Sequence, residues 1–190
     1  MAIPMFTPTS HNTSSYKPKE DGRMKISAVM KTTISALLLS SAMTSLAGNL
    51  TVSKNITVNA SPETTWKMIG NFNHLDVWHP VVVDSQLVKG DGQSPGSLRL
   101  LTLGNGATIT EKLVSHNDSA KRYTYAIVKS PLPVSDYVST ISVSPAANGK
   151  ATVTWNSTFD AKGAEDAEAV KTISGIYDAG LKNLDKHFNQ

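Results

Sequence analysis

AEDAEAVKTISGIYDAGLKNLDKHF, residues 164–188, is the segment on which the predicted fold depends. Its apolar residues recur at steps of three and four, and charged residues such as Lys171 and Asp178 lie off that stripe. The stripe consists of Val170, Ile173, Tyr177, Leu181, Leu184 and Phe188. This spacing predicts one long amphipathic helix whose apolar face must be buried against another element. Gly175 and Gly180 each weaken helix propensity by about 1 kcal/mol relative to Ala, so we expect a packing reason for each, such as a close approach to a sheet.

Six short runs rich in β-branched residues precede this helix, with turn residues between them. The predicted strands span residues 81–89, 97–103, 107–117, 122–129, 136–144 and 150–160. The separators are typical of hairpins, and Gly104-Asn105-Gly106 is the strongest of them. Consecutive hairpins predict an antiparallel meander.

One further strand and two helices are predicted before these runs. Residues 50–58 alternate well enough to form a strand. Ser61 as N-cap, followed by a proline and an acidic first turn, predicts a helix over residues 62–69. A short second helix is predicted over residues 72–77, and Pro80 stops it. The fold class is therefore α+β, in the order strand, two helices, six strands and a long helix, and a curved seven-stranded sheet around the last helix tends to enclose a cavity.

Composition excludes several kinds of protein. The chain has 190 residues, of which 39% are hydrophobic and 17% charged, which is typical of a globular protein. It has no cysteine, which excludes a disulfide framework, thiolate metal sites and cysteine nucleophiles. His74 and His79 are five residues apart, so they do not share a helical face and predict no metal site. We expect no cofactor, and we expect His116 and His187, near element ends, to face solvent.

The basic character of the chain belongs to its first 47 residues. They hold five of the 18 basic and two of the 15 acidic residues, which leaves 13 of each sign in residues 48–190. A segment with no net charge offers no electrostatic attraction for a polyanion. We therefore expect no nucleic-acid partner.

The first 47 residues also predict export. Residues 24–47 have a basic start, a short apolar run and small residues before Gly48, which is typical of a signal peptide cleaved near Ala47. The apolar run is too short to cross a bilayer, which needs about 20 residues, although an uncleaved anchor is the alternative. Residues 1–23 are rich in Pro, Ser, Thr and Lys and predict either a disordered leader or a start-site artefact. The predicted domain is residues 48–190, in the bacterial periplasm or secreted, with no integral membrane segment.

An ordered series of short motifs runs through residues 49–190. They are SPETTW at 61–66, NF at 71–72, WHP at 78–80, PGSLR at 95–99, NG at 105–106, EKL at 111–113 and SPLPVSDY at 130–137. This series resembles the START-like (SRPBCC) superfamily, and within it the MxaD-like branch of the polyketide cyclase/dehydrase and lipid-transport group. The resemblance implies the helix-grip fold and a pocket for a hydrophobic small molecule between the long helix and the sheet. MxaD-like proteins are periplasmic and are associated with methanol oxidation.

Glu111 is the sharpest candidate for chemistry. In the predicted strand it shares a face with apolar residues, which should point inward. That face consists of Ala107, Ile109, Glu111 and Leu113. A carboxylate there is expected to act as a polar anchor for a ligand or as a general acid or base. The alternative is a glutamate at a wet mouth, or one paired with a neighbouring Tyr or with Arg99.

Other residues are expected to line the same cavity. Tyr125, Tyr137 and Trp155 fall on inward registers, where core packing is the alternative to ligand contact. Leu132 lies between two prolines and is expected to act either as a lid or as part of a rigid connection. The predicted ligand-binding residues are Phe72, Trp78, Glu111, Tyr125, Leu132, Tyr137, Trp155, Ile173 and Tyr177.

Three functions are compatible with these residues. The first is an exported, non-catalytic protein that binds a hydrophobic or amphipathic small molecule. The second is an enzyme of the cyclase or dehydratase kind, in which Glu111 and a tyrosine such as Tyr125 or Tyr137 move protons. The third is an accessory protein that binds a periplasmic redox enzyme through its surface. The enzyme function needs two polar groups that converge within hydrogen-bond reach in the cavity. Glu111 is the one inward titratable residue not equally explained by core packing, so binding without catalysis is favoured.

Overall fold

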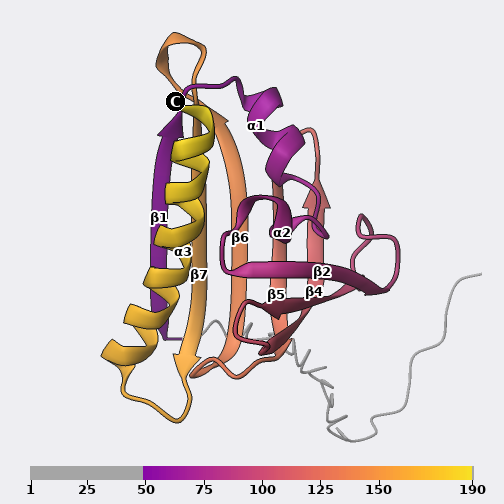
Figure 1. Cartoon of the computed structure of the whole chain (residues 1–190), viewed down its shortest axis with the longest axis vertical. Helices are drawn as coiled ribbons and strands as arrows, with labels where there is room; N and C mark the ends of the chain where they lie inside the picture. Colours follow the sequence, from indigo (N-terminus) through magenta and orange to yellow (C-terminus); the bar gives the residue numbers. More distant parts are fainter. Residues whose placement is uncertain (1–48, 190) are drawn as a thin grey trace, which may run out of the picture. The chain divides into compact units, whose positions relative to one another are not determined.

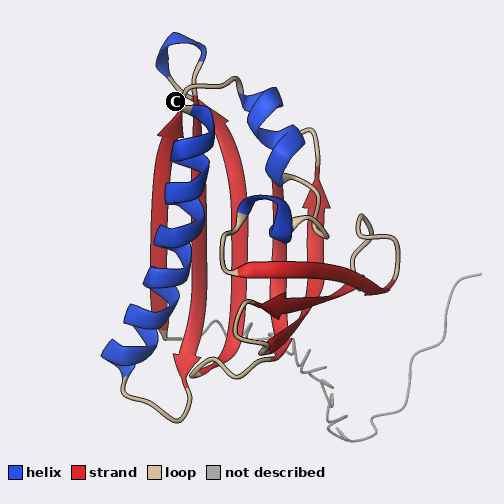
Figure 2. Ribbon diagram, in the orientation of Figure 1, coloured by secondary structure: helices blue, strands red, loops and turns tan. Residues whose placement is uncertain are grey.

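Seven antiparallel strands and three α-helices make up the part of the chain that the computed structural model describes, residues 49–189. The sheet has the order β1-β7-β6-β5-β4-β3-β2, so β2 to β7 form a meander and β1 pairs with β7 as an edge strand (Figures 1 and 2). The elements are β1 (Leu50–Val58), α1 (Pro62–Ile69), α2 (Leu75–Trp78), β2 (Val82–Lys89), β3 (Leu98–Leu103), β4 (Thr108–Asn117), β5 (Arg122–Lys129), β6 (Val134–Pro145), β7 (Ala151–Ala161) and α3 (Asp166–Phe188). The predicted α+β, helix-grip architecture is confirmed. The predicted signal peptide and leader lie outside the described residues.

The helices between β1 and β2 begin and end on local side-chain signals. The hydroxyl of Ser61 accepts a hydrogen bond of 3.1 Å from the Thr64 N–H and caps α1. The predicted second helix over residues 72–77 is shorter than expected and begins at Leu75. The reason is the Asn71 carboxamide, which accepts from the Asn73 N–H at 2.9 Å and holds the chain in a turn.

The turn between β3 and β4 sets the register of the site. Gly106 has a φ of 84°, which glycine adopts without strain, and the Leu103 N–H donates to the Ala107 carbonyl at 2.8 Å. Counting back from this turn places Arg99 on β3 directly opposite Glu111 on β4. The strongest predicted hairpin therefore aligns a cation with an anion on the inner face.

Helix α3 lies along β1 and β7 (Figure 1). Its central stripe residues are buried, whereas Val170 and Phe188 at its ends are half-buried. At Gly180 a Cβ would lie 2.6 Å from the His79 ring and 3.0 Å from the Trp155 ring, which confirms a packing reason for this glycine. At Gly175 a Cβ would meet nothing within 4 Å, so the same expectation for Gly175 is wrong.

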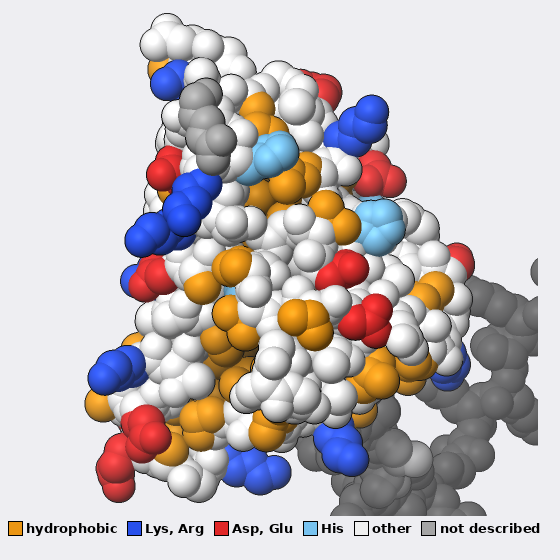
Figure 3. Space-filling view, in the orientation of Figure 1, with side chains coloured by type: hydrophobic (Ala, Val, Ile, Leu, Met, Phe, Trp, Pro, Cys, Tyr) orange, Lys and Arg blue, Asp and Glu red, His pale blue; other side chains and the backbone are white. Residues whose placement is uncertain are grey.

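The surface carries charges of both signs. Lys and Arg side chains are interspersed with Asp and Glu over the face shown in Figure 3, as the balanced charge of residues 48–190 predicts. Among the helices of residues 49–189, none is long and apolar enough to cross a membrane.

Candidate functional site

A small, partly open cavity of about 60 Å³ lies between the concave face of the sheet, α2 and α3. Aliphatic side chains dominate its wall. The lining residues are Leu75, His79, Val81, Val82, Leu101, Leu103, Ile109, Glu111, Tyr125, Ile127, Leu132, Tyr137, Trp155, Ile173 and Ile176. Pockets for drug-sized ligands measure roughly 300–1,000 Å³, so any ligand larger than a few heavy atoms requires some of these side chains to move.

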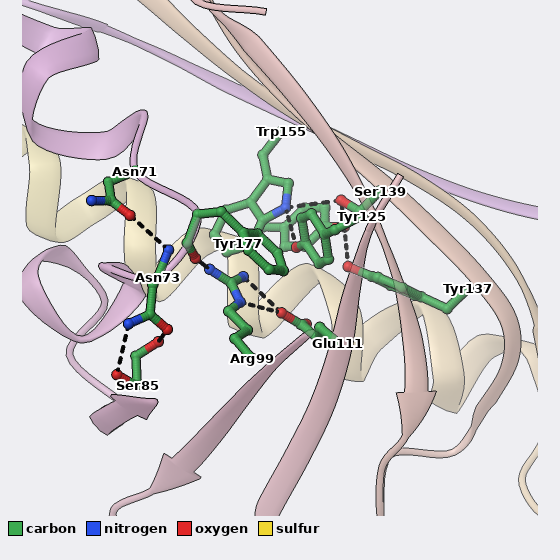
Figure 4. Close-up of polar contacts among 11 residues, drawn as sticks. Asn71, Asn73, Ser85, Arg99, Glu111, Tyr125, Tyr137, Ser139, Trp155 and Tyr177 are labelled. Atoms are coloured by element: carbon green, nitrogen blue, oxygen red, sulfur yellow. Dashed lines mark hydrogen bonds and ion pairs between the residues drawn. The ribbon is translucent and has the colours of Figure 1, made fainter. Parts of the chain in front are cut away.

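Arg99 and Glu111 form a buried ion pair at the wall of this cavity (Figure 4). Arg99 Nε lies 2.8 Å and Nη2 2.7 Å from Glu111 Oε2, and both side chains are almost fully buried. Arg99 Nη1 donates to the carbonyl of Phe72, and the guanidinium carbon lies 4.3 Å from the centre of the Phe72 ring. Glu111 is therefore paired with Arg99, as one of the expectations from the sequence had it, and this pairing uses only one of its two carboxylate oxygens.

Burial and charge attraction oppose each other in this pair. Burial raises the pKa of the Glu111 carboxyl above its ordinary value, although the nearby Arg99 guanidinium acts to lower it. Burial acts to lower the pKa of Arg99, but the Glu111 carboxylate raises that pKa above its ordinary value. A guanidinium stays charged in proteins, so Glu111 supplies the countercharge that Arg99 needs in the interior.

A second polar network centres on the indole of Trp155 (Figure 4). Trp155 Nε1 lies 3.1 Å from the Tyr125 hydroxyl and 3.0 Å from Ser139 Oγ. Ser139 Oγ also lies 3.0 Å from the Tyr177 hydroxyl, which is 2.6 Å from the Tyr137 hydroxyl. The Tyr177 ring stacks on Trp155 with 4.2 Å between ring centres. These bonds hold the aromatic rings in fixed positions, and the rings of Tyr125, Tyr137 and Trp155 belong to the cavity wall.

His79 fastens α3 to the chain that leads into β2. Its Nε2 donates to the Ile176 carbonyl at 2.9 Å, which leaves Nδ1 to accept from the Val81 N–H at 3.3 Å. Formed together, the two bonds require the neutral imidazole, because Nδ1 accepts a hydrogen bond only when it carries no proton. Burial lowers the pKa of His79, although the bond to Ile176 acts to raise it.

Comparison with known proteins agrees with this geometry. Residues 49–189 match the family described as polyketide cyclase/dehydrase and lipid transport. The chain belongs to that family. Its fold is that of the START-like (SRPBCC) superfamily.

Solved structures of the same fold include three from bacteria. The protein XoxI from Bacillus cereus is 36% identical with a TM-score of 0.70, over 74% of this chain and 96% of that one. An uncharacterised protein from Bacillus thuringiensis is 35% identical with a TM-score of 0.70, over 74% and 100%. A protein from Thermobifida fusca is 27% identical with a TM-score of 0.66, over 73% and 93%. The comparison with curated proteins gives no significant match.

The predicted ligand-binding residues divide into two groups in this family member. Six of them line the cavity: Glu111, Tyr125, Leu132, Tyr137, Trp155 and Ile173. The other three, Phe72, Trp78 and Tyr177, are buried behind its wall. Phe72 packs on Arg99, Trp78 packs edge-on against Trp155, and Tyr177 stacks on Trp155. These three therefore support the wall in this structure without forming it.

The sequence pattern does not single out His79 as part of the site, and it misplaces His116. His79 follows Trp78 at the end of a four-residue helix, where no periodic signal shows which way its side chain points. The position of His116 near an element end predicts a solvent-facing side chain, but that side chain is only 4% exposed. It donates to the Gly70 carbonyl at 2.8 Å and so ties β4 to the end of α1. The expectation that His116 faces solvent is therefore wrong.

Metal-binding groups do not gather in the described part of the chain. Within residues 49–189, three or more His, Asp or Glu side chains are nowhere placed to hold one ion. The chemistry that the cavity offers comes from one carboxylate, tyrosine hydroxyls and apolar surface.

Proposed function

We propose that the protein is an exported, non-catalytic binding protein for a small hydrophobic or amphipathic molecule. The observation that supports this proposal is the cavity itself, because its wall is mainly aliphatic and aromatic. An apolar wall with a few fixed polar groups is typical of a small-molecule site. The family description, which includes lipid transport, agrees with the same role.

The entry route that we propose runs past Leu132. This half-buried residue lines the cavity and lies in the connection between β5 and β6, with a proline on each side. Its N–H donates to Ser130 Oγ at 2.9 Å, and its carbonyl accepts from the Val134 N–H at 2.8 Å. Apart from these bonds, the Pro133 carbonyl accepts from the Lys162 N–H at 3.0 Å, so the connection can move and admit a ligand once that single bond opens, without breaking the sheet.

A cyclase or dehydratase function is the second candidate. It is favoured by one observation: Glu111 and Tyr125 line the same cavity. Against it, the Glu111 carboxylate is held by Arg99 and the Tyr137 hydroxyl by Tyr177. A general base must reach the proton that it removes, and a carboxylate held in this way is better suited to fixing a ligand than to proton transfer.

Native mass spectrometry of the protein purified from the periplasm is the test. We expect an apolar species to accompany the protein and to be released on denaturation. A chain recovered without any small molecule, but with a bound protein subunit, would contradict the binding function and support the accessory, MxaD-like role. Sequencing of the recovered chain tests export at the same time, and we expect it to begin at Gly48.

A pair of variants shows whether the molecule occupies this cavity. Ile173 is 1% exposed and lines the cavity, so Ile173→Phe should fill the space and abolish co-purification. Val128 is 58% exposed on β5, and Val128→Phe is the matched control that should retain the molecule. Equal retention by both variants would place the molecule elsewhere.

A further inference from the structure

The hydroxyl hydrogens around Trp155 can be assigned one after another. Ser139 Oγ donates to the Asn156 carbonyl at 2.8 Å, and a carbonyl only accepts. The hydrogen of Ser139 is thereby used, so the Tyr177 hydroxyl must donate to Ser139. Tyr177 in turn must accept from the Tyr137 hydroxyl. The donor and the acceptor of each hydrogen bond in this series of hydroxyl groups are therefore determined.

The hydroxyl hydrogen of Tyr125 takes no part in this series of hydrogen bonds. Its hydroxyl oxygen accepts from Trp155 Nε1, and among residues 49–189 no acceptor lies within bonding distance of its own hydrogen. Tyr125 is 1% exposed and lines the cavity. Burial raises the pKa of Tyr125 well above its ordinary value, and the Glu111 charge adds to this shift, so the hydroxyl stays protonated. The wall therefore presents one hydrogen-bond donor without an acceptor.

Glu111 presents the complementary acceptor. Both nitrogen contacts from Arg99 use Oε2, and Oε1 has no hydrogen bond to any residue within 49–189. Glu111 lines the cavity, whereas Arg99 does not. Glu111 and Tyr125 both line the cavity, and no hydrogen bond joins them to each other.

We propose that the ligand carries a hydroxyl group that accepts from Tyr125 and donates to Glu111 Oε1, with its apolar part against the aliphatic wall. This inference rests on the proposed binding function and narrows it to a class of ligand: compact, uncharged alcohols or phenols. The ligand must be compact because the cavity volume is only about 60 Å³.

Other polar groups fit this pair less well. A carbonyl accepts from Tyr125, but it brings its oxygen beside a carboxylate oxygen with no hydrogen between them. An ammonium donates to Glu111, but it cannot accept from Tyr125 and it adds a second cation close to Arg99. A hydroxyl has both a hydrogen and lone pairs, so it satisfies both groups at once.

Three probes of similar size and different polarity test the inference: cyclohexanol, cyclohexanone and methylcyclohexane. Their dissociation constants are measured by titration of the purified protein, with the indole ¹⁵N–¹H signal of Trp155 as a reporter of the site. We expect cyclohexanol to bind about tenfold more tightly than cyclohexanone, because only the alcohol donates to Glu111.

Two tyrosine variants provide the matched comparison. Tyr125→Phe removes the donor and keeps the ring, and we expect it to weaken cyclohexanol binding about tenfold without changing methylcyclohexane binding. Tyr123→Phe is the control, because the Tyr123 hydroxyl is buried without a partner and does not line the cavity. It should bind all three probes as the wild type does.

The remaining outcomes separate this inference from the proposed function. Binding of all three probes with equal affinity, unchanged by Tyr125→Phe, would overturn the hydroxyl assignment and leave the binding function standing. An equal loss in the Tyr123→Phe control would also overturn it, since the effect would then come from packing. Failure of all three probes to bind a protein that still co-purifies with an apolar molecule would overturn the assignment alone, whereas the same failure in a protein that carries no molecule would overturn the binding function as well.

Discussion

At the scale of single residues, the interior holds a buried ion pair between Arg99 and Glu111 within a mainly apolar core. Arg99 is fully buried and is held by Glu111, the Phe72 carbonyl and the face of the Phe72 ring. Removing two charges from water costs several kcal/mol per ion, and only a well-placed partner offsets that cost. The stability of each member therefore depends on the presence of the other.

The first prediction concerns this dependence. Glu111→Gln leaves the Arg99 guanidinium without a countercharge, so we expect the free energy of unfolding to fall by about 3–5 kcal/mol. The double variant Arg99→Met, Glu111→Gln removes the buried charge and should recover part of that loss. Urea unfolding of the wild type and both variants measures the difference, and a single variant within about 1 kcal/mol of the wild type would contradict the prediction.

A second prediction concerns pH and His79. The pKa of His79 is lowered in the folded protein, so below about pH 6.5 the unfolded chain binds a proton that the folded chain does not. Stability supplied by the neutral imidazole is therefore fully present only above about pH 6.5. It is lost as the pH falls from there toward the folded-state pKa, by at most about 1.4 kcal/mol per pH unit.

His79→Gln tests this pH dependence. The destabilisation that the substitution causes should be smaller at pH 5 than at pH 7, as measured by urea unfolding at each pH. His74 is exposed on the preceding turn, and His74→Gln serves as the control that should follow the wild-type profile. A destabilisation by His79→Gln that is the same at both pH values would rule out titration of His79 as the cause.

At the scale of elements, the close approach of α3 to the sheet depends on a residue without a side chain. Gly180 faces the rings of His79, Trp155 and Trp78, whereas Gly175, five residues earlier, has open space around it. The two glycines have the same intrinsic cost in a helix. Their surroundings in the folded protein give them opposite roles.

A third prediction uses these glycines as a matched pair. Gly180→Ala should lower the free energy of unfolding by about 1–3 kcal/mol, because its Cβ forces α3 away from the three rings. Gly175→Ala should raise it by up to about 1 kcal/mol through helix propensity alone. Thermal or urea unfolding of the two variants measures both effects, and changes of the same sign would contradict the packing account.

At the scale of the whole molecule, the sheet and α3 enclose a cavity that is too small for a large ligand as it stands. Expansion requires parts of the wall to move, and the strands cannot move without breaking their hydrogen bonds. Leu132 lies in the β5–β6 connection, outside the strands, so it is a lining residue that can be displaced without breaking the sheet. Ligand entry and ligand size are thus properties of the assembled domain.

The fourth prediction concerns that movement. Leu132→Ala shortens the side chain on the proposed entry route, so cyclohexanol should associate severalfold faster, as measured by NMR exchange between free and bound signals. Val114→Ala is the control, because Val114 is 43% exposed on β4 and is not part of the wall. An association rate unchanged by Leu132→Ala would exclude this route of entry.

The order of elements, the hairpins and the inward face of Glu111 could all be predicted from the amino-acid sequence. These features depend on local signals: a period of two along β4, a period near 3.6 along α3, and a glycine turn at residues 104–106. The position of Arg99 opposite Glu111 is also local in origin, since the turn sets the register of β3 on β4.

Which of the predicted residues reach the cavity could be learned only from the folded chain. Phe72, Trp78 and Tyr177 are aromatic and buried, as expected, yet they lie behind the wall. Only the three-dimensional structure shows the hydrogen bonds of His79 and the cavity volume. The same holds for the hydroxyl hydrogen bonds around Trp155, in which the hydrogen of Tyr125 is not used. These properties depend on how side chains from several elements fill a shared space, and periodicity along one element carries no information about that space.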